Sequence, residues 1–327
     1  MENHVRWGII GCGDVCEKKS GPAFYKAEHS ALTAVMRRDG AKVADFARRH
    51  GVPKYYTRAE DLLADPQVDA VYVATPPSTH REYALMAMRA GKPVYVEKPM
   101  GMDYAQCTEM LKVSEETGQK LFTAFYRRGL PYFLKVKSLL DGGAVGKVLT
   151  VGIRHCRAPL PSDLQPGGQS WRVDGGIAGE GYFYDLAPHT FDILDFLLGE
   201  IADACGYAEN RGGLYAVKDT VSASFRFKSG VPGTGAWCFV APESSAEETV
   251  EIVGTAGKLC FSVFSFAPIR LVHGIETESY PVETPEHVQQ PLIQEVVNDL
   301  RGIGQSPSTG ANGARTAWVM DRIMGKS

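Results

Sequence analysis

The sequence predicts an α/β fold in which an N-terminal, doubly wound parallel sheet is followed by an α+β region with a large, mostly antiparallel sheet. Three features support this prediction. Short apolar strands alternate with amphipathic helices through the first third of the chain, a glycine-containing turn follows the first strand, and later strand candidates follow one another without intervening helices. We place the parallel-sheet domain at residues 1–123 and the α+β domain at residues 124–327.

The elements of the first domain follow from hydrophobic periodicity and from turn residues. Strands are predicted at 5–10, 31–36, 54–56, 69–77, 93–99 and 120–125. Helices are predicted at 41–51, 59–65, 79–92 and 104–120. The stretch Ser20–Lys26 is interpreted as the end of a helix. Repeated strand–helix–strand units of this kind make an open sheet with helices on both faces.

The second domain has a different pattern. Helices are predicted at 131–140, 182–198, 287–302 and 311–323. Strands are predicted at 148–157, 222–227, 235–240, 249–254, 258–264 and 269–274, and a Pro/Gly-rich irregular stretch at 158–170. Strands in series with short turns make an antiparallel sheet.

The bulk composition is that of an ordinary globular protein. The chain has 327 residues, enough for two domains, and a formal net charge of −3. Nothing in this charge favours a nucleic-acid partner, and no apolar run approaches the roughly 20 residues that span a bilayer. The start of the sequence lacks a signal-peptide pattern, so we expect a cytoplasmic protein without a membrane partner.

The seven cysteines are scattered along the chain, and no CxxC pair or histidine-rich cluster accompanies them. An odd number of cysteines in a large chain favours reduced thiols over a disulfide framework. We therefore expect most of them to be small core residues and predict no metal site.

A turn with the first two glycines of GxGxxG follows the first predicted strand. Gly11 and Gly13 supply these glycines, Asp14 and Val15 follow them, and Cys16 stands at the third position. Such a turn brings bare backbone next to a pyrophosphate, with a helix directly after it. A small thiol can serve the close helix–strand packing that the third glycine usually serves. The position of the turn predicts a dinucleotide site in a Rossmann domain.

The end of the second predicted strand bears on the choice of cofactor. A site for NAD carries an acid about 20 residues after the glycines, to hold the ribose 2′-hydroxyl. Here Arg37 stands in that place and Arg38 follows it, which favours a 2′-phosphate and hence NADP over NAD. The alternative is a solvated turn, and the neighbouring Asp39 leaves NAD open as the cofactor.

Two further strand ends carry candidate site residues. Glu97 and Lys98 end a strand that is predicted to be buried, and a lysine there needs compensation because an unpaired buried charge costs several kcal/mol. Thr75, Pro76, Pro77 and His80 follow another strand, in a segment that is interpreted as a cofactor loop, as a rigid corner capped by Ser78 or Thr79, or as both.

The second domain contains an acid and a histidine at helical spacing. Asp185 and His189 are spaced i, i+4 and share one helix face, where His189 can transfer a proton and Asp185 can orient the substrate or raise the basicity of His189. Asp192, one turn further, is interpreted as structural. The alternative is that His189, on an apolar helix, is a core residue whose hydrogen bonds are satisfied and which has no role in catalysis.

Three more residues are candidates for binding a substrate. Tyr126 follows the last parallel strand, next to two arginines that are alternatively interdomain ion pairs. Trp171 and Arg172 precede the helix of His189, and an aromatic face beside a guanidinium suits a sugar-like or cyclic polyol ligand. A buried tryptophan that anchors a loop is the alternative.

With these motifs placed, the chain resembles the Gfo/Idh/MocA oxidoreductases over nearly its whole length. The resemblance rests on "GIIGCGDV", "DAVYVATPPSTH", "AGKPVYVEKPM", "FYRRGLP" and "AGEGYFYDLAPHTFDILDFLLG", and it is greatest to the dihydrodiol, anhydrofructose and xylose dehydrogenase branch. It implies that Lys98 lies beside the nicotinamide, that the Lys98–Pro99 peptide is cis, that the loop from Thr75 touches the cofactor, and that the second-domain sheet forms a homodimer or higher homo-oligomer.

The sequence thus predicts an NADP(H)-dependent oxidoreductase that transfers hydride to or from a hydroxyl or carbonyl group of a sugar, polyol or cyclic diol. Lys98 would hold the substrate oxygen, and His189 would pass the proton directly or together with Lys98. Two alternatives are a non-catalytic dinucleotide-binding regulator or sensor and an NAD-assisted, redox-neutral glycoside hydrolase.

Overall fold

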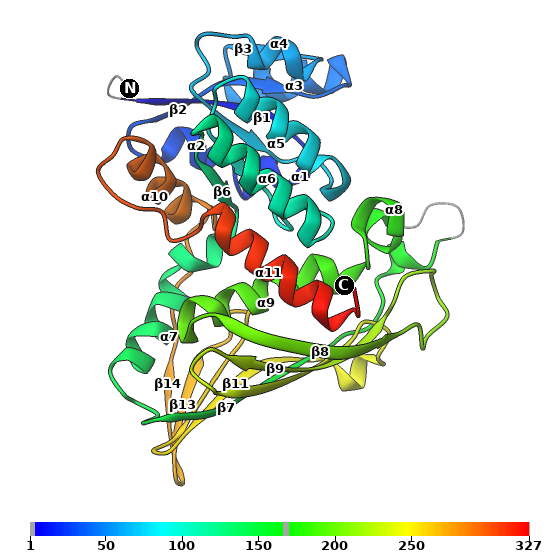
Figure 1. Cartoon of the computed structure of the whole chain (residues 1–327), viewed down its shortest axis with the longest axis vertical. Coiled ribbons are helices and arrows are strands. Elements are labelled where there is room, and N and C mark those ends of the chain that lie inside the picture. The colour runs from blue at the N-terminus through cyan, green and yellow to red at the C-terminus, as the bar shows by residue number, and fades with distance from the viewer. Residues whose placement is uncertain (1–3, 166–169, 327) are drawn as a thin grey trace. The chain divides into compact units, whose positions relative to one another are not determined.

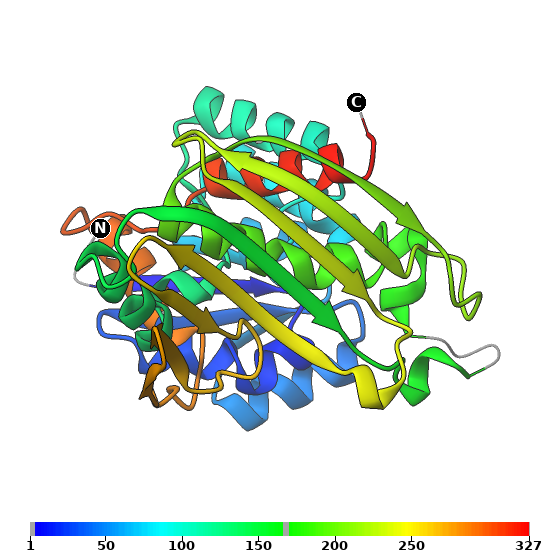
Figure 2. The ribbon, with the colours of Figure 1, turned by 90° about the horizontal axis from the view of Figure 1, so that it is seen from below.

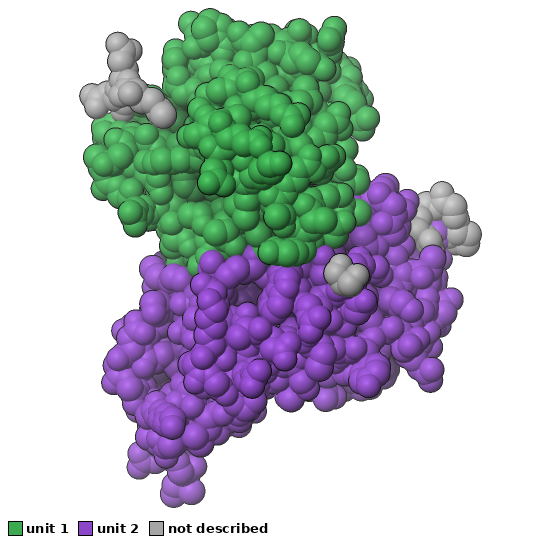
Figure 3. Space-filling view, viewed as in Figure 1, with its two compact units in different colours: residues 1–130, 285–314 green, residues 131–284, 315–327 purple. Residues whose placement is uncertain are grey.

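The structure, a computed structural model, describes residues 4–165 and 170–326. By its internal contacts the chain forms two units, residues 1–130 with 285–314 and residues 131–284 with 315–327 (Figures 1 and 3). These units differ from the predicted domains in two respects. The first unit runs to Leu130 instead of 123, and it regains the segment 285–314 from the C-terminal part of the chain.

Within the described residues, the first unit contains a six-stranded sheet whose strand pairs are all parallel. Its strands are β1 Val5–Ile10, β2 Ser30–Met36, β3 Lys54–Tyr56, β4 Ala70–Val73, β5 Val94–Val96 and β6 Leu121–Thr123. Its helices are α1 Asp14–Lys18, α2 Gly21–Lys26, α3 Gly40–His50, α4 Ala59–Leu63, α5 His80–Arg89, α6 Tyr104–Thr117 and α10 Gln290–Leu300, with the 3₁₀ turns η1 Pro77–Thr79 and η2 Tyr126–Gly129.

The strand order β3-β2-β1-β4-β5-β6 confirms the doubly wound fold. It turns around between β1 and β4, the place where such sheets bind ligands outside the carboxyl ends of their strands. Strands β1, β4, β5 and β6 are almost completely buried, as expected for a parallel sheet covered by helices on both faces.

The interpretation of Ser20–Lys26 as a helix end is wrong, because α2 is itself a short helix. Its proline stands in the first turn, where the missing N–H has no helical partner to lose. Phe24 then packs between Trp7 and Tyr72, each with a ring-centroid distance of 5.0 Å. Gly21 allows this close approach, since a Cβ there would lie 2.0 Å from the carbonyl oxygen of Cys16.

In the described part of the second unit, eight strands form a sheet in the order β14-β13-β12-β11-β7-β10-β9-β8. They are β7 Val148–Cys156, β8 Ile201–Glu209, β9 Thr220–Phe227, β10 Pro232–Cys238, β11 Glu247–Gly254, β12 Lys258–Phe261, β13 Ile269–His273 and β14 Glu276–Tyr280. The helices are α7 Pro131–Asp141, α8 Gly175–Ala178, α9 Tyr182–Leu198 and α11 Gly310–Ile323, and the 3₁₀ turns are η3 Pro161–Asp163, η4 Trp171–Val173 and η5 Glu243–Ser245. The division between the units falls within α11.

The prediction of a mostly antiparallel sheet is confirmed, since only β7 and β10 pair in parallel. The two edge strands, β8 and β14, were not predicted. Most residues of β8 are polar, small or exposed, and the same holds for all but one residue of β14. Neither strand therefore shows the alternation of apolar and polar residues that identifies a half-buried strand. In addition, β12 ends three residues before the predicted 264.

One face of this sheet is covered by α9 (Figures 1 and 2). The ring centroid of Phe191 lies 5.6 Å from those of Phe225 in β9 and Trp237 in β10, and Phe183 lies 5.1 Å from Trp237. The alternation of buried and exposed residues along β9 directs its aromatic side chains to this face. The helix that carries Asp185 and His189 is therefore fixed on the sheet by an aromatic core.

The irregular stretch predicted at 158–170 contains η3, and its residues 166–169 lie outside the described part. None of the described helices combines the length and the apolar character that a membrane crossing requires.

Candidate functional site

In the first unit, the predicted residues that follow β1, β2, β4 and β5 lie at one edge of the sheet, the carboxyl edge, since all these strands run parallel. Gly11 follows β1 with φ +92°, a conformation that favours glycine. A Cβ at Gly11 would lie 2.6 Å from the Thr75 side chain, so the turn after β1 and the loop after β4 touch. Around Gly13 the nearest atom to an added Cβ would be 3.9 Å away, which leaves the backbone accessible on that side.

The residue at the third glycine position packs as the sequence predicts. Cys16 is fully buried, and its Sγ lies 3.9 Å from the carbonyl oxygen of Gly11. Burial raises the pKa of this thiol, so it stays protonated and apolar. Asp14 is exposed and Val15 half-buried in the first turn of the short helix α1.

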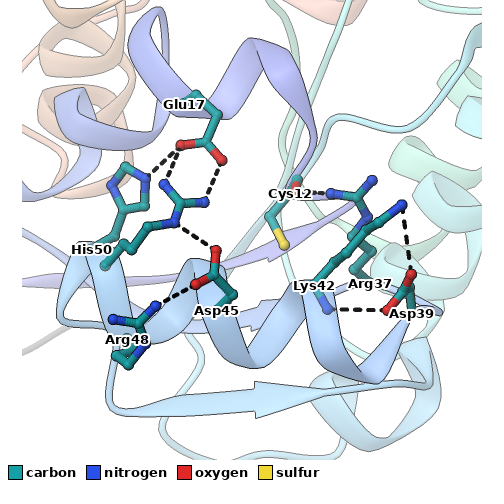
Figure 4. Close-up of polar contacts among 9 residues, drawn as sticks. Cys12, Glu17, Arg37, Asp39, Lys42, Asp45, Arg48 and His50 are labelled. Carbon is teal, nitrogen blue, oxygen red and sulfur yellow. Dashed lines mark hydrogen bonds and ion pairs between the residues drawn. The ribbon is translucent and has the colours of Figure 1, made fainter.

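Arg37 folds back toward the glycine turn (Figure 4). Its Nη1 lies 3.4 Å from the carbonyl oxygen of Cys12, and its side chain comes from the residue directly after β2. Arg38 is exposed. Asp39 is engaged elsewhere: its carboxylate accepts the backbone N–H of Lys42 at 3.0 Å as the N-cap of α3 and pairs with the Lys42 ammonium at 3.6 Å. The backbone hydrogen bond to Lys42 is the main cause that lowers the pKa of Asp39.

The loop after β4 is held by a buried histidine. His80 is 1% exposed, and its Nε2 and Nδ1 lie 2.7 Å from the carbonyl oxygen of Thr75 and 2.8 Å from that of Pro99. Its ring thus joins the loop after β4 to the loop after β5. Pro76 is exposed and Pro77 buried. The Thr79 hydroxyl donates to Thr75 and Pro76 and makes no cap bond at α5, so the capping alternative does not hold for that residue.

Burial lowers the pKa of His80, while the two carbonyl contacts oppose this shift. A neutral imidazole can donate to only one of two carbonyl oxygens, so the two short contacts favour the protonated ring. His80 therefore mainly connects the two loops. Its contact with the second loop could not be predicted from the local sequence, because Pro99 lies 19 residues further along.

Lys98 is half-buried at the end of the segment that leaves β5, and its bond to Pro99 is cis, as the resemblance implies. The acid before it faces a buried network. The Glu97 carboxylate accepts the Tyr72 hydroxyl at 2.6 Å, the Gln289 side-chain amide at 2.6 Å and the backbone N–H of Lys98 at 3.2 Å. These three donors stabilise a carboxylate that is only 8% exposed.

The segment after β6 is also buried. Tyr126 is 9% exposed, and the Arg127 guanidinium lies 4.8 Å from the centre of its ring. Arg128 donates to the carbonyl oxygen of Pro307 at 3.0 Å, a contact within the first unit.

In the second unit, α9 presents Asp185 and His189 at successive turns. Asp185 accepts a hydrogen bond from Nε of Arg172 at 2.9 Å, and this guanidinium stacks at 4.6 Å on the ring of Trp171. The two predicted substrate residues are therefore joined to the predicted acid. Trp171 is 36% exposed, which argues against the alternative of a buried loop anchor.

His189 is 5% exposed, and its ring lies edge-on to Phe264 with a centroid distance of 5.8 Å. The loop of Phe264 is held by strand β11, because the Glu248 carboxylate accepts the backbone N–H groups of Val263, Phe264 and Ser265 at 2.6, 3.1 and 3.4 Å. Asp192 is 1% exposed, in agreement with the structural interpretation.

The sequence did not single out the polar groups that end β7. His155 contacts Phe264 at 5.1 Å, on the same ring that His189 contacts. Arg157 follows two residues later and lies 4.2 Å from the centre of the Tyr182 ring. The Tyr182 hydroxyl donates to Asp163 at 2.7 Å, and Asp163 is fully buried. The signal was present, since His155 and Arg157 alternate with Cys156 and continue the inward positions Val151 and Ile153.

Cysteines and acids outside these groups add no metal site. Among the described residues, no set of three or more His, Cys, Asp or Glu side chains could hold a metal ion. Cys12, Cys16, Cys107 and Cys260 are buried, Cys156 and Cys238 are half-buried, and Cys205 is exposed.

Comparisons with known proteins agree with this geometry. The model of an oxidoreductase family with an NAD-binding Rossmann fold, GFO/IDH/MocA, matches residues 5–125, and the model of a GFO/IDH/MocA C-terminal domain matches residues 133–260. Together these matches cover most of the chain.

Individual relatives extend over the whole length. Oxidoreductase P35 of Formosa agariphila is 40% identical and is matched over 99% of this chain and 100% of its own. The 1,5-anhydro-D-fructose reductase of Ensifer adhaerens is 31% identical over 94% of this chain and 92% of its own. A putative NADPH-dependent oxidoreductase from Desulfitobacterium hafniense shares the fold, with a TM-score of 0.87, 22% identity and coverage of 99% of this chain and 96% of that one. The chain belongs to the GFO/IDH/MocA family of oxidoreductases.

Proposed function

We propose that the chain is an NADP(H)-dependent oxidoreductase that transfers hydride between nicotinamide and a hydroxyl or carbonyl group of a sugar, polyol or cyclic diol. The observation that carries the cofactor choice is the state of the groups after β2. The Arg37 guanidinium lies against the glycine turn, whereas the acid that could hold a 2′-hydroxyl, Asp39, is engaged with Lys42. A guanidinium suits a 2′-phosphate. The Asp39 carboxylate, which could otherwise hold a ribose 2′-hydroxyl, is already engaged with Lys42.

The residues at the carboxyl edge fit a dinucleotide. Gly11 makes the tight turn that a side chain would block, and Gly13 offers backbone with open space beside it. Arg37 and Arg38 supply positive charge at the strand end where the ribose of such a cofactor lies. The nicotinamide, when bound, supplies the hydride acceptor or donor.

Two side chains of the chain itself are assigned to the chemistry. Lys98, half-buried and next to the Glu97 network, holds the substrate oxygen and stabilises its negative charge. His189 takes or gives the proton of that oxygen, directly or together with Lys98. Asp185 positions the Arg172 guanidinium, and Tyr126, Trp171 and Arg172 are assigned to substrate binding.

The names of relatives support a carbohydrate-like substrate class. Besides the anhydrofructose reductase, a trans-1,2-dihydrobenzene-1,2-diol dehydrogenase of Mus musculus is 29% identical over 85% of this chain. A myo-inositol 2-dehydrogenase of Thermotoga maritima is 32% identical over 70% of this chain. A cyclic carbinol or its ketone is common to these names.

The test is the absorbance of reduced nicotinamide. Purified protein is mixed with NADP(H) or NAD(H) and with aldoses, inositols, anhydro-sugars and cyclic diols, and an Arg37→Ser variant is run beside an Arg48→Ser control on the exposed face of α3. We expect turnover with NADP(H), and a loss of the preference for NADP over NAD by roughly tenfold or more in Arg37→Ser alone. Cofactor binding without any absorbance change would contradict the proposal and favour a sensor or a redox-neutral hydrolase.

We also propose a homodimer through the outer face of the eight-stranded sheet, as the family resemblance implies. Alternate residues of β9, such as Ser222, Ser224 and Arg226, are exposed on that face. Light scattering after size exclusion tests it, and a monomer at micromolar concentration would contradict it.

A further inference from the structure

At the end of β7 the second unit has a guanidinium with two buried donors that have no protein acceptor. Nε and Nη2 of Arg157 lack a hydrogen-bond partner among the described residues. The nearest carboxylate oxygen, Oδ2 of Asp163, is 3.8 Å from Nη2, longer than a hydrogen bond. Asp163 in turn accepts the Tyr182 hydroxyl and the backbone N–H of Leu160, so its oxygens are engaged elsewhere.

Two further side chains near Arg157 also have buried polar atoms without a hydrogen-bond partner among the described residues. Nδ1 of His155 and the hydroxyl of Tyr215 are buried without a partner among the described residues, and each side chain belongs to a residue that is only 7% exposed. His155 precedes Arg157 by two positions and so shares its face of the sheet. Tyr215 is close enough for the charges of Asp163 and Arg157 to act on the pKa of its hydroxyl, which burial raises most.

Such a set of groups is costly without a ligand. Each buried polar group that stays unpaired costs about 1–3 kcal/mol, and a charged donor costs more. Burial, and then the Arg157 charge, lower the pKa of His155 to about 4, so the imidazole is neutral and Arg157 is the positive group of the set. Among the described residues no acceptor lies within hydrogen-bond distance of Nε or Nη2 of Arg157, so a bound ligand could supply one.

The geometry of the donors limits the ligand. Nε and Nη2 lie on one edge of the planar guanidinium and donate in parallel, which matches the two oxygens of one carboxylate. Hydroxyl groups could accept the same bonds but carry no charge, whereas a carboxylate also balances the guanidinium charge, which Asp163 pairs only at 3.8 Å.

We infer that the second unit recognises a substrate with a carboxylate, an acidic sugar or sugar acid, which Arg157 binds in bidentate fashion while His155 and Tyr215 contact neighbouring oxygens. The inference rests on the proposed function in one respect, that this unit receives the substrate. His155 and His189 contact the same Phe264 ring, so the histidine of this cluster and the proposed proton-transfer group share one neighbour in the second unit.

The experiment compares acids with their neutral counterparts on the full chain loaded with NADP. The pairs are D-glucuronate with D-glucose, D-galacturonate with D-galactose and D-gluconate with D-glucitol, and the dissociation constants come from titration calorimetry. We expect at least one acid to bind about tenfold or more tightly than its partner, the size of a charge-assisted hydrogen-bond pair. Equal affinities within every pair would overturn the inference.

Variants of one strand provide the control. Arg157→Met should abolish the preference for the acid, and Arg157→Lys should weaken it, because lysine keeps the charge and loses the planar fork. Arg154→Met removes an exposed arginine that pairs with Glu247 on the opposite face of β7 and should leave the preference unchanged. A preference that survives in Arg157→Met overturns the inference, and if that variant does not fold, Arg157→Lys and the wild-type pairs decide.

The same data separate this inference from the proposed function. Preferential, Arg157-dependent binding of an acid without any change in nicotinamide absorbance would contradict the oxidoreductase and leave the carboxylate site standing. Turnover in which acids show no advantage over their neutral counterparts, equally in the wild type and in Arg157→Met, would overturn the carboxylate site and leave the oxidoreductase standing.

Discussion

Two clusters of polar groups, one in each unit, differ in how their hydrogen bonds are satisfied. At the carboxyl edge of the first unit, His80 and Glu97 are buried and have short contacts to protein groups of other loops. In the second unit, His155, Arg157 and Tyr215 have buried donors or acceptors that no described residue satisfies. The difference teaches that the contacts of His80 and Glu97 form a frame that needs no ligand, whereas the cluster around Arg157 leaves donors that a ligand could use.

The largest expected effect is on catalysis, when one proposed catalytic residue of each unit is replaced. Lys98→Ala and His189→Ala should each lower kcat by roughly 10²–10⁴-fold, the range for a positioned acid, base or charge stabiliser. If the two side chains act on one substrate oxygen, the double variant loses much less than the product of the two single losses. The measurement is kcat for the four proteins with NADP(H).

The exposed Lys112→Ala variant, whose lysine pairs with Glu116 on α6, is the matched control and should turn over normally. Multiplicative losses in the double variant would mean that Lys98 and His189 act independently, against the proposed roles.

A second test distinguishes the structural role of the glycine turn from its role in contacting the cofactor. Gly11→Ala places a Cβ 2.6 Å from Thr75 at a φ of +92°, so we expect a loss of stability of about 1–3 kcal/mol together with weaker cofactor binding. Gly13→Ala has room for its Cβ and an ordinary φ of −103°, so we expect nearly normal stability.

Because Gly13 offers its bare side to the cofactor, the same alanine should still weaken NADP binding by about tenfold. Thermal unfolding and fluorescence titration with NADP measure the two effects. Normal cofactor affinity in Gly13→Ala would contradict the assignment of this turn.

The smallest effect is in pH dependence and compares one buried histidine from each unit. Burial lowers the pKa of His155 from 6.5 to about 4, so below pH 6.5 the unfolded chain binds a proton that the folded chain does not. Stability should therefore fall as the pH falls from 6.5 toward 4, by at most roughly 3 kcal/mol from this residue. The two carbonyl contacts of His80 oppose its shift, so its share should be smaller.

The measurement is the free energy of unfolding in urea between pH 4 and 7 for the wild type, His155→Gln and His80→Gln. The slope should flatten more in His155→Gln. If the slope of stability against pH changed as much or more in His80→Gln, the protonated form of His80 would be less stabilised than that of His155. That result would contradict the contrast between the two units.

Much of the first unit could be predicted because its signals are local. Each strand, turn and helix of a parallel sheet lies within a short window, and the carboxyl edge then places the residues after Ile10, Met36, Val73 and Val96 together. The helix α2 was missed because glycine and proline usually end helices, whereas Pro22 here begins one.

The groups that sequence reasoning missed depend on contacts between distant residues. The Gln289 amide donates to Glu97, 192 residues away in the sequence. Arg157 became a candidate only because Asp163 accepts the Tyr182 hydroxyl and so has its oxygens engaged. The edge strands β8 and β14 escaped notice because an edge carries polar residues on both faces, and only its pairing identifies it as a strand.

The return of residues 285–314 to the first unit has a consequence for synthesis. The two units alternate along the chain, since residues 131–284 of the second unit separate the two parts of the first, and residues 315–327 complete the second. The ribosome must therefore deliver residues 131–284 before the parallel-sheet unit is complete. Glu97 meets the amide of Gln289 only after the chain has grown by 192 residues. The parallel-sheet unit, whose residues are the first to be made, therefore cannot be finished until nearly the whole chain has been made.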